Sequence, residues 1–242
     1  MDEIAILDSL RLIIGVIILA YASYTDIKTR RASNYLWVIM AILAVIILVV
    51  HVFLMPSEEF ELYKYYLLFI PIMIVLVYLL FQLRLIFGGA DAKALMALAI
   101  LVPFQPNIYD IPIQSGSIMP ASWQIFANSI ILFLLIPISL FFYNLAKRNI
   151  NFPHIFLGYK MKISKARENF VWPLEKIKDG KRKFSYMPKD FDIDKELDEF
   201  EKNNIDEIWV TPKVPFMIPL LGGFIFTFVF GDIMFFIMNL FS

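Results

Sequence analysis

Residues 36–54 read LWVIMAILAVIILVVHVFL, a stretch without Asp, Glu, Lys or Arg. A helix of this length can cross a bilayer, because about 20 apolar residues span the hydrocarbon core. Similar runs occur at Leu10–Tyr24, Tyr66–Phe87, Trp123–Tyr143 and Pro215–Phe241. The chain is 60% hydrophobic with a mean hydropathy of +0.70, well above the roughly 45–50% apolar content of soluble domains. The sequence therefore predicts an integral membrane protein.

A shorter apolar run covers Ala92–Val102. Gly88-Gly89 interrupts the run before it, and Pro103 closes it, because proline cannot continue a helix. We interpret this segment as a short fourth helix, which brings the predicted number of transmembrane helices to six.

One hydrophilic segment, residues 144–213, separates the fifth run from the sixth and mixes acidic with basic residues. The predicted fold is an all-α membrane protein of six transmembrane helices with a small cytoplasmic domain inserted before the last helix. The expected domains are 1–143 with helices one to five, the soluble segment 144–213, and 214–242 with helix six. Within the soluble segment, residues 190–203 have the pattern of an acidic helix, and either an α/β or an irregular fold fits the remainder.

Basic residues gather at alternate ends of the predicted helices. Lys28, Arg30 and Arg31 follow the first run, and Arg84 and Lys93 flank the break between the third and fourth runs. Lys and Arg favour the cytoplasmic side. The opposite ends carry mainly acidic residues: Asp2, Glu3, Asp8, Glu58, Glu59, Glu61 and Asp110. We therefore expect a multi-pass protein of the cell membrane with both termini outside.

Composition excludes several function classes. The chain has no cysteine, which excludes disulfides, thiol nucleophiles and cysteine-ligated zinc. His51 and His154 form no metal-ligand motif. The formal net charge is zero and no glycine-rich phosphate loop is present, so nothing indicates a nucleic-acid partner.

Two aspartates lie at the predicted cytoplasmic boundary. Asp26 stands in residues 24–28 (YTDIK), after the first run, and Asp91 in residues 88–93 (GGADAK), before the fourth. Carboxylates at membrane depth are costly and usually functional. Two that share a site hold one proton between them, which suits general acid–base chemistry on water. Gly88-Gly89 would let backbone approach an extended substrate closely.

These motifs resemble the membrane aspartic proteases with a G-x-G-D motif, and within them the prepilin and preflagellin peptidases. Asp26, followed by Arg30-Arg31 and Asn34, matches the first motif. Gly88, Asp91 and Lys93 match the second.

The sequence departs from the second motif at Ala90, where that motif has a second glycine. The six predicted helices, the long insert and residues 206–212 (DEIWVTP) narrow the resemblance to archaeal preflagellin (archaellin) peptidase.

The resemblance implies an aspartic endopeptidase that removes a short basic leader from preflagellin or type IV prepilin-like precursors at the cytoplasmic membrane boundary. In such precursors the leader stands just before a hydrophobic helix of the subunit. Asp26 and Asp91 would be catalytic. Gly88, Gly89, Ala90, Lys93, Arg84 and Asn34 would support the motifs or the substrate. No metal or organic cofactor is implied, and the partners would be the precursor proteins and the lipid bilayer.

Other interpretations compete with this one. Either aspartate alone fits a structural role, Asp26 facing headgroups and Asp91 capping a helix. A proton- or ion-coupled transporter could use the two as a relay, although that predicts acids near the midplane. A non-catalytic partner in filament assembly is a further alternative. Asp232 is expected in an interfacial turn, and Gly222-Gly223 in close helix packing.

Overall fold

The computed structural model describes residues 3–86, 88–109, 111–113, 117, 119–178, 180–185 and 193–240. Phe87, Asp2, Asp110 and residues 190–192, which enter the predictions above, lie outside these ranges. The chain divides into two units, Met1–Phe133 with Pro215–Ser242, and Leu134–Val214. The predicted domain boundaries at 143/144 and 213/214 remain predictions.

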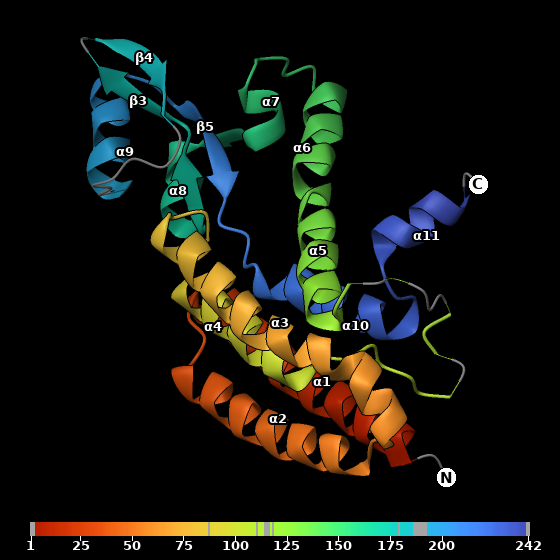
Figure 1. The fold of residues 1–242 in the computed structure, drawn as a ribbon. Helices are drawn as coiled ribbons and strands as arrows, with labels where there is room; N and C mark the ends of the chain where they lie inside the picture. The colour runs from red at the N-terminus through yellow and green to blue at the C-terminus, as the bar shows by residue number, and fades with distance from the viewer. Residues whose placement is uncertain are drawn as a thin grey trace. The chain divides into compact units, whose positions relative to one another are not determined.

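The first unit consists of helices, which Figure 1 shows packed against one another. Their bounds are α1 (Glu3–Thr29), α2 (Asn34–Leu54), α3 (Ser57–Gln82), α4 (Gly89–Leu101), α5 (Ala121–Phe133), α10 (Met217–Val229) and α11 (Ile233–Leu240). Helices α1 and α2 are longer than the predicted apolar runs, because polar residues at their ends also adopt a helical backbone. Helix α3 begins earlier than expected, at Ser57, and tolerates Pro71 in its interior.

Helix α4 lies at the centre of this unit and contacts α1, α2, α3 and α5. Four of its buried positions are alanines: Ala92, Ala94, Ala97 and Ala99. Small side chains let neighbouring helix backbones approach closely. The alanine-rich sequence of α4 therefore suits a helix surrounded by others.

The count of six transmembrane helices is not confirmed. Among the described residues, four helices are long and apolar enough to cross a membrane: Glu3–Thr29, Asn34–Leu54, Tyr63–Gln82 and Ala121–Ala146. A bent pair, Met217–Val229 with Ile233–Asn239, makes a fifth if it is one span. Helix α4 has 13 residues, which at 1.5 Å per residue reach about 20 Å, short of a hydrocarbon core about 30 Å thick.

Two predicted helices are interrupted, each for a local reason. The predicted run Trp123–Tyr143 breaks at Leu134, because Pro137 has no N–H to donate to the carbonyl one turn earlier. The last run bends by 54° between α10 and α11. Gly231, with φ of 84°, ends α10 in the left-handed conformation that glycine adopts readily.

The second unit combines helices with short strands. They are α6 (Leu135–Ala146), α7 (His154–Leu157), β1 (Tyr159–Lys162), α8 (Ile163–Glu168), β2 (Val171–Pro173), β3 (Glu175–Lys178), β4 (Lys181–Phe184), α9 (Ile193–Lys202) and β5 (Glu207–Pro212). Strand β5 lies between β1 and β2 in an antiparallel sheet, with Tyr159 opposite Val210 and Pro173 opposite Val210 on the other side. A second pair, β3–β4, is also antiparallel.

These sheets correct the all-α description, which fits the described part of the first unit but not the second. The predicted acidic helix is present as α9, and its two buried side chains, Leu197 and Phe200, join a core with Ile208 and Val210 of β5. Its acidic face pairs with Arg167, which lies 2.5 Å from Asp198. The insert is therefore a small α+β unit around its own core.

Candidate active site

The antiparallel order of the first helices brings four segment ends together. In Figure 1 the end of α1, the start of α2, the end of α3 and the start of α4 lie at the same end of the first unit. Asp26, Asn34, Arg84 and Asp91 belong to these four segments. Residues that are far apart in the sequence therefore share one end of the helix bundle.

Asp26 and Asp91 are half-buried and approach each other from different helices. Asp26 lies in the last turn of α1, and Asp91 is in the first turn of α4. Their carboxyl groups are close enough to interact electrostatically. Among the described residues, no side chain donates a hydrogen bond to either carboxyl. Two neighbouring carboxyls without structural hydrogen bonds are suited to exchange a proton with a third molecule.

Gly88 leaves the space that the Asp91 side chain occupies. It is the N-cap of α4 with φ −89° and ψ 116°, a conformation open to any residue. A Cβ atom there would lie 2.0 Å from Oδ2 of Asp91 and 2.7 Å from its Cγ. At Gly89 the nearest atoms to an added Cβ belong to Phe81, at 3.8 Å. A side chain at position 88 would therefore force the Asp91 carboxyl to move, whereas one at position 89 would make only ordinary contacts.

Ala90, the departure from the motif, is compatible with this geometry. It is the second residue of α4 and has helical backbone. Positive φ values occur elsewhere among the described residues, at Arg30, Arg84 and Gly231 for example, but not at Ala90. A side chain at this position therefore costs no backbone strain.

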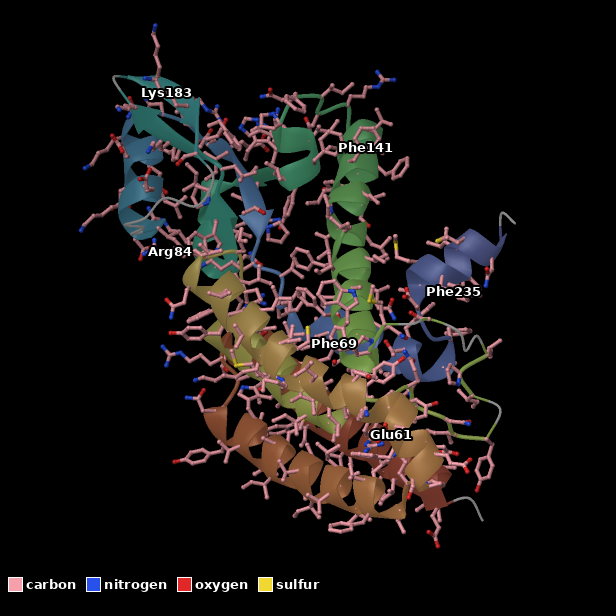
Figure 2. The ribbon with its side chains drawn as sticks, viewed as in Figure 1. Glu61, Phe69, Arg84, Phe141, Lys183 and Phe235 are labelled. Carbon is pink, nitrogen blue, oxygen red and sulfur yellow. The ribbon has the colours of Figure 1, made fainter. Side chains whose placement is uncertain are left out.

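Lys93 and Asn34 connect α4 to α2. The Lys93 ammonium donates a hydrogen bond to Oδ1 of Asn34, at 2.8 Å. Arg84 makes no such connection. Its side chain is exposed in the turn after α3, and in the described part of the chain no hydrogen bond joins it to the aspartates. Figure 2 shows it at the end of α3 opposite to Glu61. The structure thus gives Asn34 and Lys93 a shared position, but it gives Arg84 no contact with the acids.

Arg30, four residues after Asp26, interacts with the site. Its guanidinium is close enough to attract the Asp26 carboxyl, and its backbone N–H donates to the Asp26 carbonyl at 3.0 Å. The spacing of four residues could have indicated this contact in the sequence, although Arg30 follows the end of α1 and has a φ of 55°. Arg30 therefore belongs to the environment of Asp26.

A buried polar network at the other end of α1 was not predicted from the sequence. Arg11 donates to Asp8 at 2.5 Å and lies 2.9 Å from Nδ1 of His51. The second Asp8 oxygen accepts the Asn107 backbone N–H at 2.8 Å. All three side chains in this network are buried. The signal for it was Arg11 itself, a charge inside an apolar run with an acid three residues earlier.

The second unit has a polar pocket of about 500 Å³, lined in part by His154, Glu175, Arg182 and Trp209. Arg182 donates to Glu175 at 2.5 Å. The buried His154 ring lies 3.8 Å from the Glu175 carboxylate, too far for a hydrogen bond. Burial lowers the pKa of His154, and the nearby Glu175 opposes this shift while Arg182 adds to it. This pocket therefore places a buried imidazole beside the ion pair of Arg182 and Glu175.

The described residues around the two aspartates do not form a recognisable metal site. In the part of the chain that the structure describes, no group of three or more His, Asp or Glu side chains is arranged to hold a metal ion. The absence of a metal or organic cofactor from the chemistry remains a prediction.

Comparison with known proteins identifies the family of this chain. Residues 13–142 match the model of the type IV leader peptidase family, and residues 150–233 match that of the archaeal peptidase A24 C-terminus, type II. Preflagellin peptidase from Methanococcus maripaludis is 29% identical over 91% of this chain and 94% of its own length. Preflagellin peptidase from Methanococcus voltae is 28% identical over 90% and 94%, and that from Methanocaldococcus jannaschii 29% over 91% and 93%. The resemblance read from the aspartate motifs is confirmed, and with more than half of the chain matched, this protein belongs to the type IV leader peptidase family.

Proposed function

We propose that this chain is a membrane-embedded aspartic endopeptidase. Its substrates are preflagellin or type IV prepilin-like precursors, from which it removes the short basic leader at the cytoplasmic membrane boundary. The observation that carries the proposal is the approach of the Asp26 and Asp91 carboxyls from two helices. Membership of the leader peptidase family supports the reaction class, and the names of the relatives support the substrate class.

The two aspartates divide the work on one water molecule. The ionised carboxylate takes a proton from water as the water oxygen attacks the scissile carbonyl carbon. The protonated carboxyl donates its proton to the carbonyl oxygen, which gives a neutral tetrahedral diol. When this intermediate collapses, the C–N bond breaks and the leaving amine receives a proton from the aspartate that had deprotonated the water. One hydroxyl of the diol returns its proton to the other aspartate as the new carbonyl forms. The dyad ends with one proton between its members, as it began.

Orientation in the membrane follows from charge. Lys28, Arg30 and Arg31 adjoin the end of α1, and Lys93 adjoins the start of α4. Under the positive-inside rule, this end of the first unit faces the cytoplasm. The cut would then fall at the cytoplasmic boundary of the bilayer, where a leader with basic residues stays.

Cleavage by the purified protein tests the proposal. The full chain, reconstituted in liposomes with a preflagellin precursor, is expected to release the leader and to do so equally after treatment with EDTA. An intact precursor in the presence of folded enzyme contradicts the proposal. Proton or ion flux across the same liposomes without cleavage would instead support the transporter alternative.

A further inference from the structure

A groove of about 680 Å³ runs along the first unit between α2 and α4, with Ile74 of α3 also contributing to its wall. We call it the α2/α4 groove. On α4 its wall is formed by Lys93, Met96, Ala97 and Ile100, a spacing that places all four on one helix face. The groove is therefore an elongated hollow that follows the direction of the helices.

The polarity of the groove changes along its length. Asn34, Trp37 and Lys93 line one end, in the first turns of α2 and α4. Beyond them every lining residue is apolar, as far as Ile46 on α2 and Ile100 on α4. An occupant that matches this wall has polar groups at the end near Asp91 and an apolar body beyond.

The apolar part of the groove is shaped for a helix. Ala41 of α2 and Ala97 of α4 both line it, and small residues on facing helices let a further helix backbone approach closely. From Asn34 to Ile46 the wall extends over 12 residue steps, roughly 18 Å at 1.5 Å per residue. About three turns of a docked helix fit this length.

The polar end offers hydrogen-bond donors. Lys93 donates one bond to Asn34, and an ammonium has three donors in total. Trp37 is buried, and among the described residues its indole N–H has no acceptor. Unsatisfied donors at membrane depth cost free energy, so an occupant with accessible backbone carbonyls at this end is favoured.

The groove leads to the aspartates around the start of α4. Asp91 does not line it, but Gly89 and Ala90 precede Lys93 by four and three residues and so continue the groove-lining face of α4 toward its N-terminus. The small side chain of Ala90 leaves room for a chain to pass from the groove to the Asp91 carboxyl. A segment cut there would be extended, whereas the part inside the groove would be helical.

We propose that the α2/α4 groove binds the hydrophobic helix of the precursor, with the junction between leader and helix at the Asn34–Lys93 end. This inference rests on the proposed function, since it names the surface by which the same site selects its substrate. A lipid acyl chain is the competing occupant, but it would need neither the donors at one end nor the close approach that the alanines permit.

Crosslinking tests the occupant independently of cleavage. A photoreactive benzoylphenylalanine replaces Val45, which lines the groove, or Val50, which does not; both valines are exposed on α2, at 48% and 40%. The full chain also carries Asp91→Asn, so that bound preflagellin precursor remains uncut. We expect the probe at 45 to join the hydrophobic segment of the precursor and the probe at 50 to join lipid. Lipid adducts alone at both positions would overturn the proposal.

Kinetics on the wild-type background supply a second test. Val45→Trp fills the groove and should lower kcat/KM about tenfold, mainly by raising KM. Val50→Trp adds the same bulk outside the groove and should leave kcat/KM unchanged. Equal values for the two variants would overturn the proposal.

The two failures are distinguishable. Cleavage by wild type with lipid adducts only at position 45 rejects the groove and keeps the proposed function. A selective crosslink at position 45 without any cleavage by wild type keeps the docking surface and rejects the peptidase assignment.

Discussion

Replacing Gly88 by alanine should reduce peptide cleavage while the protein stays folded. The added Cβ would lie 2.0 Å from Oδ2 of Asp91, and an ordinary contact begins at 3.4 Å, so the carboxyl must move by roughly 1.4 Å. A misplacement of about 1 Å in a reacting group can cost about 100-fold in rate. This corresponds to about 2.7 kcal/mol in the activation free energy. Because Asp91 can rotate away, the stability cost should not exceed about 1 kcal/mol, the range for an N-cap substitution.

Gly89→Ala is the matched control, because its added Cβ comes no closer than 3.8 Å to the atoms around it. Both variants would be assayed in membranes by the rate at which a preflagellin precursor loses its leader, with enzyme levels measured by immunoblot. We expect Gly88→Ala to fall about 100-fold in kcat/KM and Gly89→Ala to match wild type. If Gly88→Ala cleaves as fast as Gly89→Ala, the reasoning that Gly88 fixes the reactive position of Asp91 is refuted.

Three further predictions concern stability, measured as thermal unfolding of the full chain in detergent. Arg11→Met should lower the free energy of unfolding by about 3–5 kcal/mol, because it leaves the Asp8 carboxylate buried without its cation. The double variant Asp8→Asn with Arg11→Met should recover part of this stability. An equal loss of stability in the single and double variants would contradict the ion-pair argument. Gly223→Ala should cost about 1–3 kcal/mol because its Cβ would lie 2.7 Å from α5 backbone, and Gly222→Ala should be tolerated, so equal effects would count against close α5–α10 packing. Burial lowers the pKa of His154 below 6.5; the unfolded chain therefore binds more protons as pH falls below 6.5, and stability declines. His154→Gln should flatten that acid slope, and an unchanged slope would exclude His154 as its source.

Sequence periodicity and charge located the long helices because apolar runs and their polar ends are local properties. The starts of α2 and α4 lie within three residues of the predicted ones. The number of membrane crossings could not be predicted from these runs in the same way. The length of an apolar run does not show whether the 13-residue α4 or the bent pair of α10 and α11 crosses the bilayer.

The candidate site was predictable in its residues but not in its contacts. The motifs named Asp26, Asp91 and Gly88, yet the reason for Gly88 is steric and appears only when the Asp91 side chain is placed. The same holds for Lys93 and Asn34, whose hydrogen bond joins residues 59 positions apart.

The strands of the second unit were left open by the sequence because β1 to β4 have at most four residues each. Runs this short carry little alternation, and the pairing of β1 and β2 with β5 joins residues far apart in the sequence. Charged residues at six of the eight positions of β3 and β4 further conceal the pattern that usually indicates a strand.

The most direct test of catalysis by the two aspartates compares Asp26→Asn and Asp91→Asn with wild type in the precursor cleavage assay. Asn keeps the size of the side chain and removes the titratable proton. Asp232→Asn is the matched control, because Asp232 caps α11 through the Met234 N–H at 2.9 Å, a role that asparagine also fills. We expect both site variants to accumulate precursor at normal protein levels and Asp232→Asn to cleave normally. Normal cleavage by either Asp26→Asn or Asp91→Asn would contradict the aspartic dyad.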